Sequence, residues 1–389
     1  MHLPREITDE IVAEIEDTAS LRAFCLVTPS FVCSSQARIF RGLQIRVDGP
    51  SPIDHRPMSP WQAESLFSSS PHLASYVQRL WIHIPTRPTE WYSPLQAVLP
   101  AFIRVREFII SASGAETRWT VLPEALKDAM QAVMLLPSLK QLELAYLSVP
   151  ATLITSMAAT IPELSLISVV VEDIEMQSSP MDLSKRALGV LTLVSISTSM
   201  VEFLATPGRL PSRRLVIAYH TEWADISKIL QGTAVTLTQL HLDFHHRLHV
   251  GPPRYYLNAL RVLELDTSAG PAPHRVPDDT LFALLHQIPT AMPHLEHLAI
   301  RVTIVPSLPR PGEAVWVRGA PLDMGSVATV DWRLCFNDHS QFAGFDDAEI
   351  GRELQDYEMV FDEFVHCMGE QMPVLRDSGG LSFSRIPLH

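Results

Sequence analysis

The sequence predicts an α/β protein with a short N-terminal three-helix module, a repeat solenoid built on a parallel sheet, and a C-terminal capping helix. Apolar residues recur at helical spacing three times before residue 41. Short strand-like segments then recur along most of the chain, and an amphipathic segment follows the last of them. The expected divisions are residues 1–41, 42–336 and 337–389.

The first expected helix covers residues 3–15, LPREITDEIVAEI. Ile7, Ile11 and Ile15 recur every four residues, which places them on one side of a helix. Pro4 suits the first helical position, because the N–H that proline lacks would have no partner there.

Two more short helices are expected before residue 41. The segment TASLRAFCLV offers Thr18 or Ser20 as an N-cap, and Pro29 begins the following helix. The next segment, LQIRV, alternates as a strand does. Three helices in about 40 residues bury little apolar surface by themselves, so part of the apolar stripe should need a partner.

The order of apolar anchors in these helices resembles the F-box, the module that docks on the Skp-type adaptor of cullin–RING ubiquitin ligases. Phe31 stands where that family usually has Trp. The resemblance implies an adaptor-binding set made of Leu3, Pro4, Ile7, Leu21, Leu26, Val27 and Phe31. Of the stripe and its neighbours, we expect Leu3, Pro4, Leu26, Val27 and Phe31 to be exposed, and Ile11 and Ile15 to pack inside. From the residues alone, the alternative is that the helices only cap the domain that follows.

Composition limits the classes of partner. The formal charge of −13 without a basic tract disfavours a surface that must neutralise nucleic-acid phosphates. No run of about 18 apolar residues is present to span a bilayer, so no membrane partner is expected. The cysteines Cys25, Cys33, Cys335 and Cys367 are too scattered for a disulfide framework or a zinc pair, which favours a cytoplasmic or nuclear location.

Beyond residue 70, segments of the form L-x-x-L-x-L recur, often after Pro. The first apolar residues of the expected strands are Leu80, Phe108, Leu142, Ile167, Leu191, Leu215, Leu240, Leu263 and Leu298. Their successive gaps are 28, 34, 25, 24, 24, 25, 23 and 35 residues, and helix-like stretches such as EWADISKILQ lie between them. The pattern resembles leucine-rich repeats. The repeats are degenerate, because the Asn that usually follows L-x-L is absent. A last strand, VATVDWRLCF, and a closing helix over residues 346–368 complete the expected stack.

Alternation along each strand predicts one buried and one exposed face of the sheet. Leu142 and Leu144 should enter the core, whereas Glu143 should point to the opposite side. We expect the exposed face to recognise a target protein. The side chains expected to contact it are Trp81, His83, Glu143, His241, Asp243, His245, Glu264 and Arg301.

The segment HLDFHHRLH is a candidate metal site, since histidine is a common zinc ligand. Its first half is already explained by the repeat pattern, so solvated histidines are preferred, and neither a metal nor a cofactor is expected. The sequence contains no G-x-S-x-G elbow, H-E-x-x-H pair or phosphate-binding glycine loop, so nothing indicates an enzyme.

Together with the repeat pattern, the resemblance to the F-box implies a non-catalytic substrate-recognition subunit of an SCF-type E3 ubiquitin ligase. It would bind a Skp-type adaptor, and through it a cullin scaffold, by its N-terminal module, and an unidentified target protein by the solenoid. The main alternative is a scaffold or sensor protein of leucine-rich-repeat type that is not linked to ubiquitylation. A third hypothesis is an unrecognised hydrolase.

Overall fold

The structure is a computed structural model that describes residues 4–46, 57–85, 90–114, 117–172, 188–218, 223–244, 256–269, 279–304, 324, 327–336 and 347–386. The chain forms two compact units, Met1–Ser178 and Ser179–His389, which we call unit 1 and unit 2. Each unit is mixed α/β with parallel main strands, so the predicted class is confirmed. The divisions at residues 41 and 336 stay a prediction.

Unit 1 begins with three helices at the predicted places, α1 (Arg5–Ala13), α2 (Thr18–Val27) and α3 (Pro29–Ile39). Asp17, rather than Thr18 or Ser20, caps α2, because its carboxylate accepts the Ser20 N–H at 2.7 Å. Val12, Leu21 and Phe31 form the buried centre of this three-helix module. The rings of Phe24 and Phe31 meet edge to face with centroids 5.1 Å apart.

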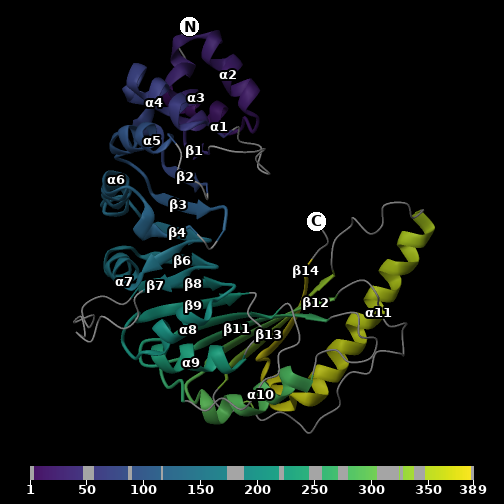
Figure 1. Ribbon diagram of the computed structural model, residues 1–389. Coiled ribbons are helices and arrows are strands. Elements are labelled where there is room, and N and C mark those ends of the chain that lie inside the picture. Colours follow the sequence, from purple (N-terminus) through teal and green to yellow (C-terminus); the bar gives the residue numbers. More distant parts are fainter. Residues whose placement is uncertain are drawn as a thin grey trace. The chain divides into compact units, whose positions relative to one another are not determined.

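The parallel strands of unit 1 follow one another in chain order. They are β1 (Gly42–Ile45), β2 (Arg79–Ile84), β3 (Glu107–Ala112), β4 (Gln141–Ala145) and β6 (Glu163–Ile167). A small second sheet pairs β5 (Ser148–Pro150) with β7 (Val170–Glu172). The helices between them are α4 (Pro60–Ser69), α5 (Tyr92–Val98), α6 (Glu124–Met134) and α7 (Ala151–Thr160), with the 3-10 turns η1 (Pro71–Tyr76), η2 (Leu99–Ala101) and η3 (Trp119–Val121). In Figure 1 the helices α5, α6 and α7 lie on one side of these strands.

One expected repeat position in unit 1 is wrong. Leu142 on β4 pairs in register with Leu164 on β6, three residues before the predicted Ile167. Leu164 and Leu166 are buried, whereas Ile167 is half-buried at the end of the strand, next to Ser168 with a positive φ of 49°. The chain turns there, so Ile167 cannot begin a strand.

The parallel strands of unit 2 also follow chain order. They are β8 (Leu188–Val194), β9 (Ser212–Ala218), β10 (Gln239–Phe244), β11 (Val262–Ala269), β12 (His297–Ile304), β13 (Thr329–Phe336) and β14 (Leu381–Ile386). The helices are α8 (Thr198–Ala205), α9 (Trp223–Thr233), α10 (Asp279–Ala291), α11 (Asp347–Gln371) and α12 (Pro373–Ser378). The predicted positions Leu191, Leu215, Leu240, Leu263 and Leu298 lie side by side in register, which confirms this part of the repeat pattern.

The C-terminal region contains one strand more than expected. The closing helix over residues 346–368 is confirmed as α11, but β14 follows it and pairs with β13, Val330 lying opposite Leu381. Gly380 precedes β14 and lies so close to Ala328 that a Cβ atom would come within 2.4 Å of the Ala328 carbonyl oxygen. The turn into the last strand therefore depends on a glycine.

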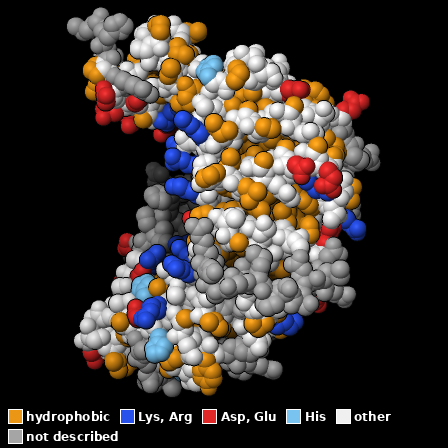
Figure 2. Space-filling model, turned by 90° about the vertical axis from the view of Figure 1, so that its left-hand side faces the viewer, with side chains coloured by type: hydrophobic (Ala, Val, Ile, Leu, Met, Phe, Trp, Pro, Cys, Tyr) orange, Lys and Arg blue, Asp and Glu red, His pale blue; other side chains and the backbone are white. Residues whose placement is uncertain are grey.

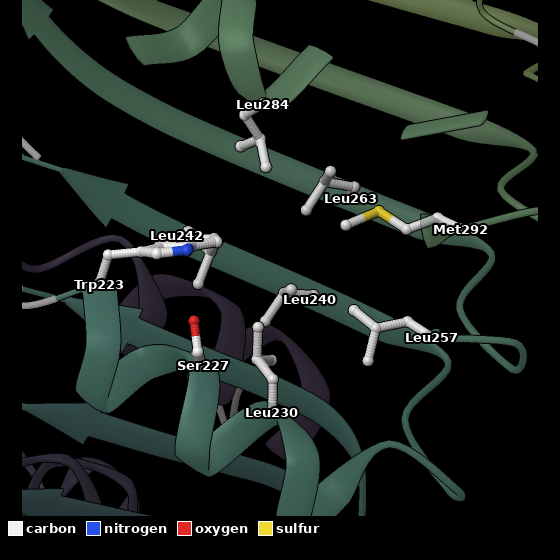
Figure 3. Close-up of a pocket in the computed structure, with 9 residues that line it drawn as sticks. All are labelled: Trp223, Ser227, Leu230, Leu240, Leu242, Leu257, Leu263, Leu284 and Met292. Carbon is white, nitrogen blue, oxygen red and sulfur yellow. The ribbon is translucent and has the colours of Figure 1, made fainter. Parts of the chain in front are cut away.

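A small gap in the core of unit 2 is shown in Figure 3. Trp223 and Leu230 of α9 face it together with leucines of β10 and β11 and with Leu284 and Met292. Its volume is about 10 Å³, near the minimum for one water molecule, and its lining is almost wholly apolar. This gap has no room for a ligand.

Candidate functional site

The end of α2 carries the most exposed apolar side chains of the three-helix module. Leu26 is 88% exposed and Val27 is 65% exposed, and Ile7 on α1 is 42% exposed. An α-helix turns by about 100° per residue. Relative to the buried Leu21, Leu26 therefore lies roughly 140° around α2 in one direction, and Val27 lies roughly 120° around it in the other direction. The helix buries Leu21 and therefore presents both residues to solvent.

The structure corrects two expected exposures in this module, those of Phe31 and Ile11, and it also buries Leu21 of the predicted adaptor-binding set. Phe31 is only 7% exposed and Leu21 only 3%, so neither offers a free side chain to an adaptor. Ile11, expected inside, is 37% exposed, because Thr8 and Val12 occupy the inner side of α1 instead. Ile15 is partly buried against the module's centre, as expected. Pro4 is exposed at the start of α1, and Leu3 lies outside the described residues.

In unit 2, three neighbouring strands bring predicted target-binding residues together. His241 on β10 lies between two carboxylates of β11, with Nδ1 3.4 Å from Glu264 Oε2 and Nε2 3.2 Å from Asp266 Oδ2. Arg301 on β12 reaches the same Asp266 carboxylate, with Nη1 3.3 Å from Oδ2. Asp243 pairs in register with Asp266. These residues form a polar network on the face opposite the leucine core, as the alternation predicts.

Sequence reasoning missed two members of this network. Asp266 contacts both His241 and Arg301, and Arg214 on β9 extends the network, with Nη2 3.2 Å from Glu264 Oε2. Asp266 follows Glu264 by two residues on the same strand, so the alternation that selected Glu264 could also have selected Asp266. His245 lies outside the described residues.

In unit 1, Trp81 and His83 on β2 share a partner on β3. The Trp81 indole N–H donates to Ser111 Oγ at 2.9 Å, and His83 Nδ1 lies 3.0 Å from the same oxygen. His83 Nε2 lies 3.1 Å from Ser113 Oγ. These contacts hold both aromatic side chains against the sheet face. Alternation from Phe108 also places Ser111 on this face, so the sequence could have indicated this partner.

Glu143 occupies the equivalent face of β4, beside Ile109 of β3 and Ser165 of β6. Burial raises the pKa of the Glu143 carboxyl above its ordinary value. Among the residues that the structure describes, none forms a recorded hydrogen bond or ion pair with this carboxylate. A half-buried carboxylate therefore lies on this face of β4.

The polar network predicts a pH-dependent stability. Hydrogen bonding to Asp266 raises the pKa of His241; burial opposes this rise, and the charges of Asp266, Glu264 and Asp243 reinforce it. Because the folded pKa lies above the unfolded one, this contribution is complete below about pH 6.5 and is lost as pH rises through the folded pKa.

We therefore expect His241→Gln to lower stability by about 1 kcal/mol at pH 5.5 and by much less at pH 8.5. Thermal melts of both proteins across this range measure the difference. The variant Asp266→Asn, which removes the carboxylate, should flatten the pH dependence of the His241→Gln effect. A His241→Gln effect of constant size from pH 5.5 to 8.5 would contradict the assignment.

Two properties of the described residues bear on the kind of site. Within the described ranges, no group of three His, Cys, Asp or Glu side chains is arranged to hold a metal ion. Over the same ranges, no helix has the length and apolar character needed to cross a membrane. The comparisons with known proteins find neither a family model nor a curated protein that matches this chain.

Proposed function

We propose that this protein is a non-catalytic receptor subunit whose three-helix module binds a Skp-type adaptor of a ubiquitin ligase and whose sheet faces bind a target protein. The observation that carries the proposal is the exposure of Leu26 and Val27 at the end of α2. Burying one such side chain fully is worth about 1.5–3 kcal/mol, which is a strong reason for a partner to cover them.

The polar sheet faces support the second half of the proposal. Asp266 contacts both His241 and Arg301, and His241 also contacts Glu264, so a target would meet a preorganised surface. In this function the chain performs no chemistry. It raises the concentration of a target near an enzyme held elsewhere in the same complex.

Titration of the full chain with a purified Skp-type adaptor tests the proposal. The double variant Leu26→Ala, Val27→Ala should weaken binding by about 30-fold or more, because truncating even one apolar anchor at an interface costs about 2 kcal/mol and two such losses need not add fully. Its melting temperature should stay almost unchanged, since both side chains are exposed in the free chain.

Two controls separate adaptor binding from folding. Val235 is 89% exposed in unit 2, so Val235→Ala removes a similar apolar side chain elsewhere and should leave adaptor binding unchanged. Leu21→Ala empties a buried position and should lower stability by about 2–5 kcal/mol. A wild-type chain that binds no Skp-type adaptor at tens of micromolar would leave the helices as a cap and favour the scaffold alternative.

A further inference from the structure

A row of basic residues lies where the strands of unit 1 begin. The Arg79 N–H donates to the Arg41 carbonyl oxygen at 2.9 Å, and the Arg106 N–H donates to Gln78 at 2.7 Å. The Lys140 N–H in turn donates to Arg106 at 2.8 Å. Arg41, Gln78, Arg106 and Lys140 therefore hold equivalent positions just before β1, β2, β3 and β4. Neighbouring members of the row are about 4.8 Å apart along the sheet.

The row borders a hollow of about 520 Å³, which we call the strand-start hollow. Five basic side chains line it, namely Arg38, Arg41, Arg79, Arg106 and Lys140. Trp81, one of the predicted target-binding residues, lines it as well. A second hollow, of about 370 Å³, shares Arg38 and Arg41 and continues along α1 and α3. In Figure 2 Lys and Arg side chains gather along one margin of the molecule, at the height of β1 to β4 in Figure 1.

Most of the positive charge in this hollow is not neutralised. Two carboxylates line it, Glu107 and Glu163, and Glu107 forms an ion pair with Arg79. Within the described residues, no ion pair is recorded for Arg41, Arg106 or Lys140. Five basic against two acidic side chains leave an excess of positive charge in a chain whose formal charge is −13. Such a segregated patch attracts an anionic partner.

We propose that the strand-start hollow binds a short acidic segment of a target protein in an extended conformation. Four positions in the row span three strand spacings, about 14 Å, which accommodates four or five extended residues. Carboxylates of the segment would meet Arg41, Arg106 and Lys140. Gln78 and Gln141 also line the hollow, and their side-chain amides would form hydrogen bonds with the backbone of the segment.

The dimensions of the hollow favour a peptide over a nucleic acid. A nucleic acid carries a phosphate at every nucleotide and binds through a long basic track, whereas this row ends after four strands. Glu107 and Glu163 interrupt the positive surface, which a segment of mixed acidic and neutral residues can match.

The inference deepens the proposed function by naming the class of target, but its test needs no adaptor. A labelled peptide with a central run of about five Asp and Glu residues is titrated against the full chain, next to an analogue with Asn and Gln at those places. The acidic peptide should bind at low salt and weaken as salt rises, and the neutral analogue should bind at least tenfold more weakly.

Charge reversal locates the binding site. The double variant Arg106→Glu, Lys140→Glu should weaken peptide binding at least tenfold. The matched control is Arg22→Glu, Arg104→Glu, which makes the same change in net charge at exposed positions that do not line the hollow. The control should bind the peptide nearly as well as the wild type, and both variants should keep the wild-type melting temperature. If the reversed pair lowers it, Arg106→Gln, Lys140→Gln serves instead.

Several results would overturn the inference. The first is an equal loss of peptide affinity in the Arg106→Glu, Lys140→Glu variant and in its control. The second is equal affinity for the acidic peptide and the neutral analogue, and the third is no binding of the acidic peptide at about 1 mM in low salt. The fourth is tighter binding of a short single-stranded oligonucleotide than of the acidic peptide. Failure here is distinguishable from failure of the proposed function. The Arg106, Lys140 variants should still bind the Skp-type adaptor, and the Leu26, Val27 variant should still bind the acidic peptide.

Discussion

Replacing Gly232 with alanine is expected to destabilise the protein by about 3 kcal/mol, the upper part of the usual range for overpacking. Gly232 lies in α9, where alanine would ordinarily be preferred by about 1 kcal/mol. A Cβ atom at this position would come within 2.0 Å of the Leu204 carbonyl oxygen and 3.2 Å of the Ala205 carbonyl carbon, both in the last turn of the neighbouring helix α8. Because these are backbone atoms, one of the two helices would have to move.

Urea denaturation of wild type and variant measures this effect. Gly369→Ala provides the matched control, because Gly369 also lies in a helix, α11, and its added Cβ atom would meet only Arg376 Cδ at 3.6 Å. The control should be as stable as the wild type or more stable by up to about 1 kcal/mol. If Gly232→Ala were equally well tolerated, the close approach of α8 and α9 would be wrong.

The second large effect is expected at Trp332, which is fully buried on β13. Its ring meets Phe364 of α11 with centroids 5.2 Å apart, and Phe364 meets Phe383 of β14 with centroids 6.1 Å apart. Trp332→Ala should therefore cost about 3–5 kcal/mol and loosen the helix that covers the last strands. Denaturation gives the free energy of unfolding, and amide hydrogen exchange in α11 reports the loosening.

Trp332→Phe separates lost packing from lost polarity. The Trp332 Nε1 atom is buried and has no hydrogen-bond partner among the described residues. Phenylalanine removes this unpaired N–H and keeps an aromatic ring against Phe364, so the cost should stay below about 1.5 kcal/mol. If the alanine variant lost less than about 1 kcal/mol, or if α11 exchanged no faster in it, α11 would not depend on this contact.

Local periodicity determined most of the element order. Leu191, Leu215, Leu240, Leu263 and Leu298 could be aligned from the sequence because alternation and spacing are properties of neighbouring residues. The same reasoning placed the three N-terminal helices and the closing helix α11. It failed for Ile167, where three apolar residues in ELSLI allow more than one strand start. It also missed β14, whose place depends on pairing with β13.

The candidate surfaces divide in the same way. Alternation alone put His241, Glu264 and Arg301 on the polar face, and it could have added Asp266. The sequence by itself thus determined the class of fold, the strand faces and the exposed end of α2. Only the tertiary structure decided that Phe31 is buried, that Gly232 touches α8, and that basic residues from Arg41 to Lys140 line one hollow. The physical reason is that burial and charge grouping depend on contacts between residues far apart in the chain, which no local pattern records.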